Sequence, residues 1–244
     1  MGFFKTKNTS ETNIKQGVFT PNTEANANDI CELVFILERS GSMAGLEADT
    51  IGGFNSMIDK QKKQDGRCYV TTVLFDDKID TVHDRAEISE ISPMTDKQYF
   101  VRGSTALLDA VGSTIEHISE IHKYIRREDV PSKTLFVITT DGMENASRRF
   151  TAEKVKKMIS LKKKENWDFL FLGANIDAVS AANDIGISED RAVRFNNDSE
   201  GIAENYKAVA NFACEMRACP SPSCNIDSSW KKDIEEDYRR RGKK

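Results

Sequence analysis

Residues 33–42 read Leu33-Val34-Phe35-Ile36-Leu37-Glu38-Arg39-Ser40-Gly41-Ser42, an unbroken apolar run that ends in polar side chains. A continuous run of this kind is typical of a strand that is buried on both faces of a parallel sheet. In open α/β sheets, ligands bind beyond the carboxyl ends of such strands. The stretch therefore predicts a parallel sheet with a polar site at its carboxyl edge.

A second stretch, Leu135-Phe136-Val137-Ile138-Thr139-Thr140-Asp141-Gly142, repeats this pattern further along the chain. Between the two lies Gly103-Ser104-Thr105-Ala106, a turn that opens a helix. The candidate site residues are Glu38, Ser40, Ser42, Thr105 and Asp141. Carboxylates and hydroxyls without histidine or thiolate suit a hard divalent cation such as Mg²⁺.

The rest of the chain alternates between strand-like and helix-like segments. The expected strands are 33–37, 68–75, 78–83, 135–139, 167–172 and 192–195. The expected helices are 46–64, a segment that begins near residue 105, 151–164, 177–184 and 200–217, whereas 87–101 is less regular. This alternation predicts an α/β, Rossmann-like doubly wound sheet, mostly parallel, with helices on both faces.

Composition divides the chain into three parts. Residues 1–28 are polar and lack apolar periodicity, so we expect a flexible leader. Residues 29–217 form the expected α/β domain. Residues 218–244 form a charged tail, and its segment 227–244 is either a peripheral helix or disordered.

Bulk properties exclude several classes of protein. The formal net charge is only -4, which gives no reason to expect nucleic-acid binding. No apolar stretch approaches the ~20 residues that span a bilayer. The five cysteines are odd in number and no export signal precedes them, so we expect reduced thiols and a cytoplasmic protein.

Taken together, the three polar motifs resemble the metal-ion-dependent adhesion site (MIDAS) of von Willebrand factor type A (VWA) domains. Their order and spacing match across about residues 30–215. The segments 72–77 and 171–175 are similar to segments of stand-alone bacterial or phage members of that family. The resemblance implies a Rossmann-like sheet with one antiparallel edge strand, for which 78–83 is the candidate.

The resemblance also implies roles for the site residues. Ser40, Ser42 and Thr105 would bind Mg²⁺ or Mn²⁺ directly, and Glu38 and Asp141 would act mainly through water. In this family an acidic residue of a protein partner often completes the metal shell. The implied function is an intracellular adaptor or scaffold that binds protein partners and is not an enzyme.

Glu38 departs from the family pattern, which begins with aspartate. The extra methylene extends the carboxylate by ~1.5 Å. It either displaces the bridging water and binds the ion directly, or crowds the site and abolishes binding. We expect metal affinity to be reduced but not lost, because Mg²⁺ tolerates little departure from octahedral geometry.

Two other functions stay open. A scaffold with a degenerate metal site would bind its partners without metal. A Mg²⁺-dependent phosphoryl-transfer enzyme is opposed by the lack of a Gly-x-Gly-x-x-Gly or Gly-Lys-Ser/Thr loop. Among nearby polar residues, Asp76 and Asp77 are expected in a hairpin turn, Asp109 at a helix N-terminus and His122 in the core.

Overall fold

The sheet is mixed and mostly parallel. The computed structural model describes residues 30–174, 176–220 and 225–241, and within them six strands form one sheet in the order β3-β2-β1-β4-β5-β6. All neighbours are parallel except β2 and β3. The strands are β1 (Ile30–Glu38), β2 (Arg67–Phe75), β3 (Ile79–Glu87), β4 (Lys133–Thr140), β5 (Trp167–Ala174) and β6 (Ala192–Phe195).

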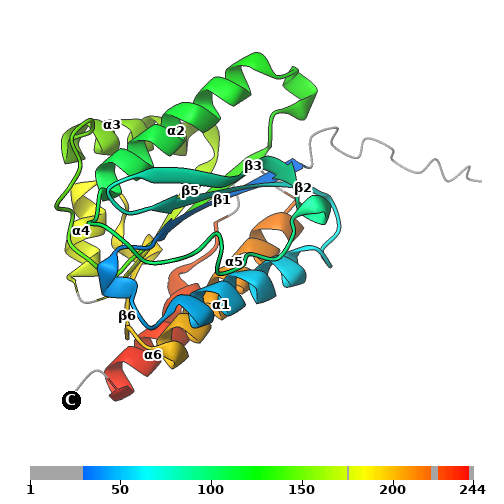
Figure 1. Cartoon of the computed structure of the whole chain (residues 1–244). Coiled ribbons are helices and arrows are strands. Elements are labelled where there is room, and N and C mark those ends of the chain that lie inside the picture. Colours follow the sequence, from blue (N-terminus) through cyan, green and yellow to red (C-terminus); the bar gives the residue numbers. More distant parts are fainter. Residues whose placement is uncertain (1–29, 175, 221–224, 242–244) are drawn as a thin grey trace, which may run out of the picture.

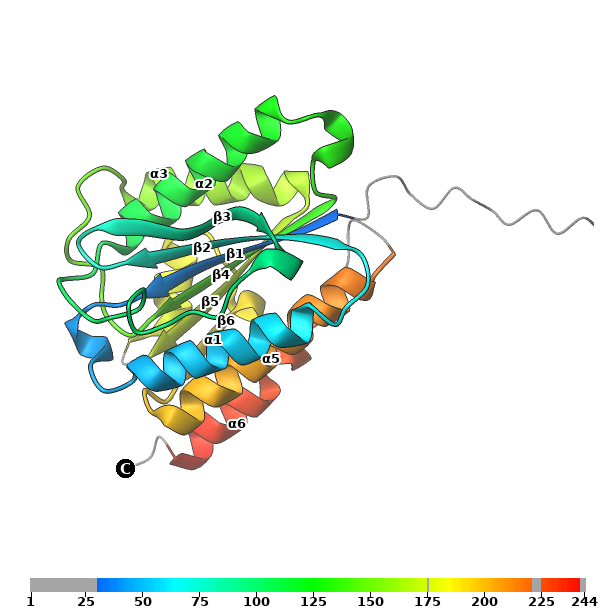
Figure 2. The same ribbon diagram turned by 45° about the vertical axis from the view of Figure 1, so that its right-hand side comes forward.

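Helices cover both faces of the sheet (Figure 1, Figure 2). One layer holds α2 (Leu107–Tyr124), α3 (Ala152–Lys162) and α4 (Ala178–Asp184), and the other holds α1 (Glu47–Gln61), α5 (Ser199–Ala218) and α6 (Lys232–Arg241). Every residue of β1 is buried because alternate side chains enter different cores. Leu33, Phe35 and Leu37 join the core on the α1 and α5 side, and Val34 and Ile36 join the other. The predicted doubly wound α/β fold is confirmed.

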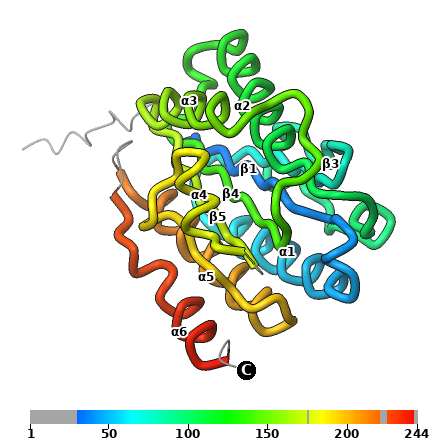
Figure 3. The backbone as a smooth tube through the Cα atoms, turned by 90° about the vertical axis from the view of Figure 1, so that its left-hand side faces the viewer, coloured from blue at the N-terminus to red at the C-terminus, as the bar shows by residue number. Residues whose placement is uncertain are grey.

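The parallel strands deliver their carboxyl ends to one edge, which faces the viewer in Figure 3. Strands β1 and β4 are direct neighbours in this edge, with Leu37 opposite Thr139. The loops that follow them must therefore lie side by side. This pairing positions the candidate site.

The antiparallel edge strand is longer than predicted. It runs from Ile79 to Glu87 instead of ending at His83. Its pairing with β2 is irregular near Thr72, and Arg85 has a positive φ of 47°. The strand continues past this bulge because the Arg85 amide donates to Thr71 Oγ1 at 3.0 Å. Periodicity alone did not predict this continuation.

The C-terminal helix α6 packs on α5 and beside the edge strand β6. Ile234 is buried, and the Trp230 ring meets Phe212 edge-on with centroids 5.7 Å apart. Lys231 Nζ donates to the Ala192 carbonyl of β6 at 2.9 Å. Of the two alternatives for the tail, residues 232–241 form a helix, whereas the expected leader 1–28 lies outside the described residues.

Among the described residues, no helix combines the length and the apolar character that crossing a membrane requires.

Candidate metal-binding site

The predicted site residues come together at the carboxyl edge of the sheet. Ser40 Oγ lies 2.7 Å from Ser42 Oγ, and Ser42 Oγ donates to Asp141 Oδ1 at 2.5 Å. Thr105 Oγ1 donates to Glu38 Oε1 at 2.7 Å. All five residues that the sequence indicated therefore belong to one cluster.

Gly142 shows how closely these oxygens converge. A methyl group placed on its Cα would lie 3.1 Å from Thr105 Oγ1, 3.3 Å from Glu38 Oε1 and 3.8 Å from Ser42 Oγ. A larger residue would press into the cluster, so the Asp-Gly pair keeps this space open. Ser42 is exposed, so the cluster is accessible from solvent.

Both carboxylate oxygens of Glu38 are hydrogen-bonded, and the residue is only 2% exposed. Besides Thr105, it accepts from the Asp141 amide at 2.9 Å and from the Thr140 hydroxyl. The longer side chain is thus accommodated, and it links the end of β1 to the two other loops. Whether it weakens metal binding stays a prediction.

Two of the three hydroxyl groups donate to the carboxylates of the cluster. Ser42 directs its proton to Asp141 and Thr105 directs its proton to Glu38. Thr105 Oγ1 thereby keeps its lone pairs for a cation, whereas Ser42 Oγ, because its proton goes to Asp141, accepts the proton of Ser40 Oγ. Three hydroxyls and two carboxylates without nitrogen or sulfur fit Mg²⁺ or Mn²⁺ by donor chemistry.

The electrostatics of the cluster favour a positive ion. Burial raises the pKa of Asp141, and the nearby negative charge of Glu38 raises it further, against the effect of hydrogen bonds from Ser42 and Asn197. The two buried carboxylates therefore repel one another across the cluster. A divalent cation between them would offset that repulsion.

No protein-family model matches the chain, and no curated protein matches it. Solved structures do. Proximal thread matrix protein 1 from the mussel byssus, with a zinc-occupied MIDAS motif, aligns with a TM-score of 0.54 at 16% identity over 77% of this chain and 46% of that chain. A von Willebrand factor type A protein from Catenulispora acidiphila aligns with a TM-score of 0.50 at 12% identity over 77% and 43%.

The fold is that of a von Willebrand factor type A domain. The antiparallel strand that the resemblance implied is present as β3. This chain spans less than half the length of the two solved chains. At these identities the likeness concerns the fold alone.

Within this VWA fold, a buried arginine beside the site was missed by sequence reasoning. Arg39 is 2% exposed, and its Nε donates to Asp76 Oδ2 at 2.8 Å. Arg102 Nε donates to the same oxygen at 2.8 Å, and both arginines also pair with Asp80. The four charges tie the Ser40 loop to the loop that carries Thr105.

Asp76 is therefore more than the hairpin-turn residue expected from the sequence. It accepts the Lys78 amide at 2.8 Å, as a turn residue does, while also holding both arginines. Burial opposes its ionisation, but hydrogen bonds from Arg102, Lys78 and Arg39 outweigh burial and lower the pKa of Asp76. A charged residue directly after a buried strand was the available signal.

Asn197 is a second residue that sequence reasoning missed. It lies between β6 and α5, and its Nδ2 donates to Asp141 Oδ2 at 2.9 Å. Because Ser42 holds the other oxygen, both oxygens of Asp141 are fixed. Nothing in the local sequence around Asn197 indicated this contact.

Asp109 and His122 have more specific roles than expected. Asp109 accepts the backbone amides of Arg148, Arg149 and Phe150 at 2.8–2.9 Å, so it holds the loop after β4 against α2. His122 does pack against the Trp167 ring, but its Nε2 also pairs with the buried Glu32. Both residues lie outside the oxygen cluster.

Proposed function

We propose that this chain is a divalent-cation-dependent protein-binding module that acts as a cytoplasmic adaptor. Ser40, Ser42 and Thr105 would hold Mg²⁺ or Mn²⁺, with Glu38 and Asp141 supplying negative charge around it. The observation that carries the proposal is the convergence of these hydroxyl and carboxylate oxygens. The mussel protein with zinc in its MIDAS motif supports it, since that protein shares the fold.

The bound ion would act as the contact point for the partner. Its protein ligands would be neutral hydroxyls, which leave most of its charge uncompensated. An acidic side chain of a partner is then the natural further ligand. Ser42 and Met143, which lies in the loop after β4, are both exposed, so a partner has room to approach the site.

Titration of Mn²⁺ into the protein, followed by calorimetry, tests the ligand set. Thr105→Val removes one hydroxyl at nearly constant volume, and we expect at least about a tenfold loss of affinity. Ser104→Ala is the matched control, because Ser104 is an exposed hydroxyl in the same turn. Equal binding by both variants would contradict the ligand assignment.

Glu38→Asp tests the departure from the family pattern. We expect the variant to bind Mn²⁺ more tightly, because the shorter side chain restores space for a bridging water. If the native chain binds as tightly as this variant, Glu38 does not weaken the site.

Two measurements separate the proposal from its alternatives. Partner capture from the source cell should occur with Mg²⁺ and be lost with EDTA, whereas EDTA-insensitive capture would favour a metal-independent scaffold. A generic phosphate ester with Mg²⁺ should not turn over, because we propose binding without catalysis. Measurable turnover would favour the phosphoryl-transfer enzyme.

A further inference from the structure

Five cationic side chains of the described residues are buried, and two of them lack a carboxylate partner. Arg39, Arg191 and Lys231 each form an ion pair with an aspartate or a glutamate. Lys133 and Arg217, which are 5% and 8% exposed, form no ion pair with a carboxylate among the described residues. Buried charges in proteins are ordinarily paired, so these two cations require an explanation.

The two unpaired cations lie together at the amino edge of the sheet, opposite the candidate metal site. Lys133 is the first residue of β4, and Arg217 lies in the last turn of α5. With Cys31 and Ser132 they line a cavity of about 230 Å³ that is open to solvent. Sites for organic ligands commonly measure about 300–1,000 Å³, so this cavity suits a smaller occupant.

Backbone carbonyl groups offset only part of the two charges. Lys133 Nζ donates to two carbonyl groups at the end of α5, that of Met216 at 2.8 Å and that of Cys219. Arg217 donates to the carbonyl group of Gln61 at 2.7 Å and to three in the loop after α1 at 3.1–3.2 Å. A helix end carries about half a negative charge, so the two ends offset about one of the two positive charges.

Each cation also keeps a donor that no described residue accepts. An ammonium group has three N–H donors, and Lys133 uses two of them. Arg217 donates through Nη1 and Nη2, whereas its Nε makes no hydrogen bond with the described residues. Two charged donors around one cavity are therefore left for a ligand.

The other groups that line the cavity do not supply the missing negative charge. The hydrogen bond with Cys68 and burial raise the pKa of Cys31, and the two buried cations offset this only in part, so Cys31 stays a neutral thiol. At the rim, Asp65 and Arg67 are exposed and carry opposite charges, so they add no net charge. About one positive charge is left uncompensated.

We propose that Lys133 and Arg217 form a binding site for a small monovalent anion of the halide class, with chloride as its ordinary occupant. The anion accepts the two unused donors and neutralises the remaining charge. It thereby joins the start of β4 to the ends of α1 and α5. The site lies at the end of β4 away from Asp141, so this inference does not depend on cation binding.

Thermal unfolding of the native chain tests the proposal. Sodium chloride replaces sodium gluconate at constant ionic strength, because gluconate is too large for the cavity. An anion that binds only the folded chain raises the melting temperature, and we expect a saturable rise of about 3–5 °C once chloride exceeds its dissociation constant about tenfold. Equal melting temperatures in the two salts would overturn the proposal.

A second buried lysine provides the matched control. Lys231 also donates to two carbonyl groups, those of Glu189 and Ala192, but it has a carboxylate partner in Glu235 at 3.0 Å. Lys133→Met should abolish the chloride-dependent rise, whereas Lys231→Met should retain it. A rise that persists in Lys133→Met, or that is lost equally in both variants, would contradict the assignment.

Crystals of the native chain grown in sodium bromide locate the ion directly, which keeps the proposal testable if Lys133→Met does not fold. Anomalous scattering should show a bromide ion between Lys133 Nζ and Arg217 Nε. A cavity without an anomalous peak would overturn the proposal, whatever the variants show.

Discussion

At the scale of single residues, two tyrosines on the α1 and α5 side of the sheet differ in one hydrogen bond. Tyr99 Oη donates to the Glu38 carbonyl at 2.6 Å. Tyr206 Oη is buried and has no partner among the described residues. We expect Tyr99→Phe to lower the free energy of unfolding by about 1–2 kcal/mol, because a bond is lost and a buried carbonyl loses its donor.

Tyr206→Phe is the matched control, and it should change the free energy of unfolding by less than about 0.5 kcal/mol. Urea denaturation of both variants measures the difference. Equal losses of unfolding free energy in the two variants would mean that the hydrogen bond of Tyr99 does not stabilise the fold.

The candidate site could be predicted from the sequence only where its residues follow buried strands or open a helix. Glu38, Ser40 and Asp141 occupy such positions, so the strand pattern placed them at one edge. Arg39 pairs with Asp76 across 37 residues, and Asn197 meets Asp141 across 56. Contacts of this kind depend on how loops pair in space, and local pattern carries no information about them.

At the scale of elements, two adjacent glycines in α1 have opposite environments. A methyl group on Gly53 would lie 2.2 Å from Tyr206 Cδ2, so the absence of a side chain lets α1 and α5 approach closely. A methyl group on Gly52 would meet nothing within 4 Å. The close helix contact therefore depends on one glycine of the pair.

Gly53→Ala should lower the free energy of unfolding by about 1–3 kcal/mol, because the Tyr206 ring must move within a packed core. Gly52→Ala should raise it by about 0.5–1 kcal/mol, because alanine favours the helix. Thermal denaturation of the two variants checks the signs. A stabilised Gly53→Ala would show that the ring is free to move away.

The helices and strands themselves were largely predictable, because apolar periodicity decides which segments can be buried. The predicted strand 192–195 and the predicted helix 200–217 agree with β6 and α5 to within one residue at each end. The edge strand was the weakest prediction. All of its residues are exposed or only partly buried, so its polar sequence resembles that of a loop.

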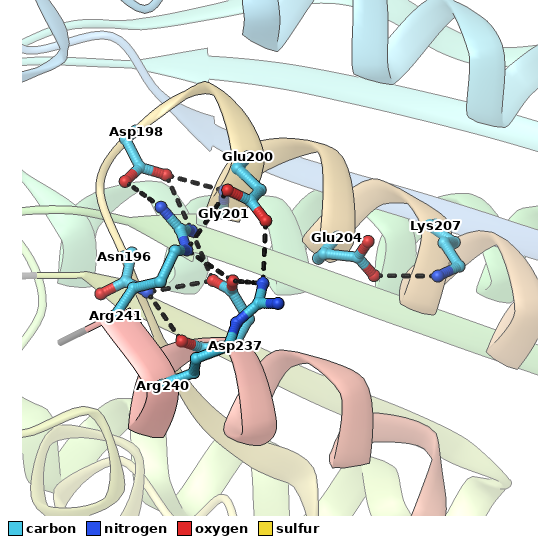
Figure 4. A network of polar contacts seen from close by, with 9 residues as sticks. All are labelled: Asn196, Asp198, Glu200, Gly201, Glu204, Lys207, Asp237, Arg240 and Arg241. Carbon is cyan, nitrogen blue, oxygen red and sulfur yellow. Dashed lines mark hydrogen bonds and ion pairs between the residues drawn. The ribbon is translucent and has the colours of Figure 1, made fainter.

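At the scale of the whole molecule, the candidate site and the C-terminal helix occupy two different regions around the sheet. Its carboxyl edge gathers the oxygen cluster, while α6 lies beside the edge strand β6 and α5. Residues 196–198, between β6 and α5, contact both regions, because Asn197 donates to Asp141 while Asn196 and Asp198 bind α6 (Figure 4). The contacts of α6 include ion pairs of Arg241 with Asp198 and Asp237, so they should respond to pH before the apolar cores do.

As the pH falls, α6 should detach from β6 and α5 before the rest of the domain unfolds. The hydrogen bond from Arg241 lowers the pKa of Asp237 to about 2, and the same arginine lowers the pKa of Asp198. When α6 detaches, both values return towards about 3.9. Because the folded values are the lower ones, this contribution is present above about pH 4 and is lost as the pH falls towards about 2.

Trp230 precedes α6 and contacts Phe212 of α5, so its fluorescence reports on this release. With Trp167 replaced by phenylalanine to remove the second indole, we expect a transition between about pH 4 and 2. Asp237→Asn, which cannot titrate, should flatten that transition, and Glu236→Gln on the same helix should leave it in place. A transition that is identical in all three chains would show that carboxylates elsewhere, and not the Arg241 network, hold the helix.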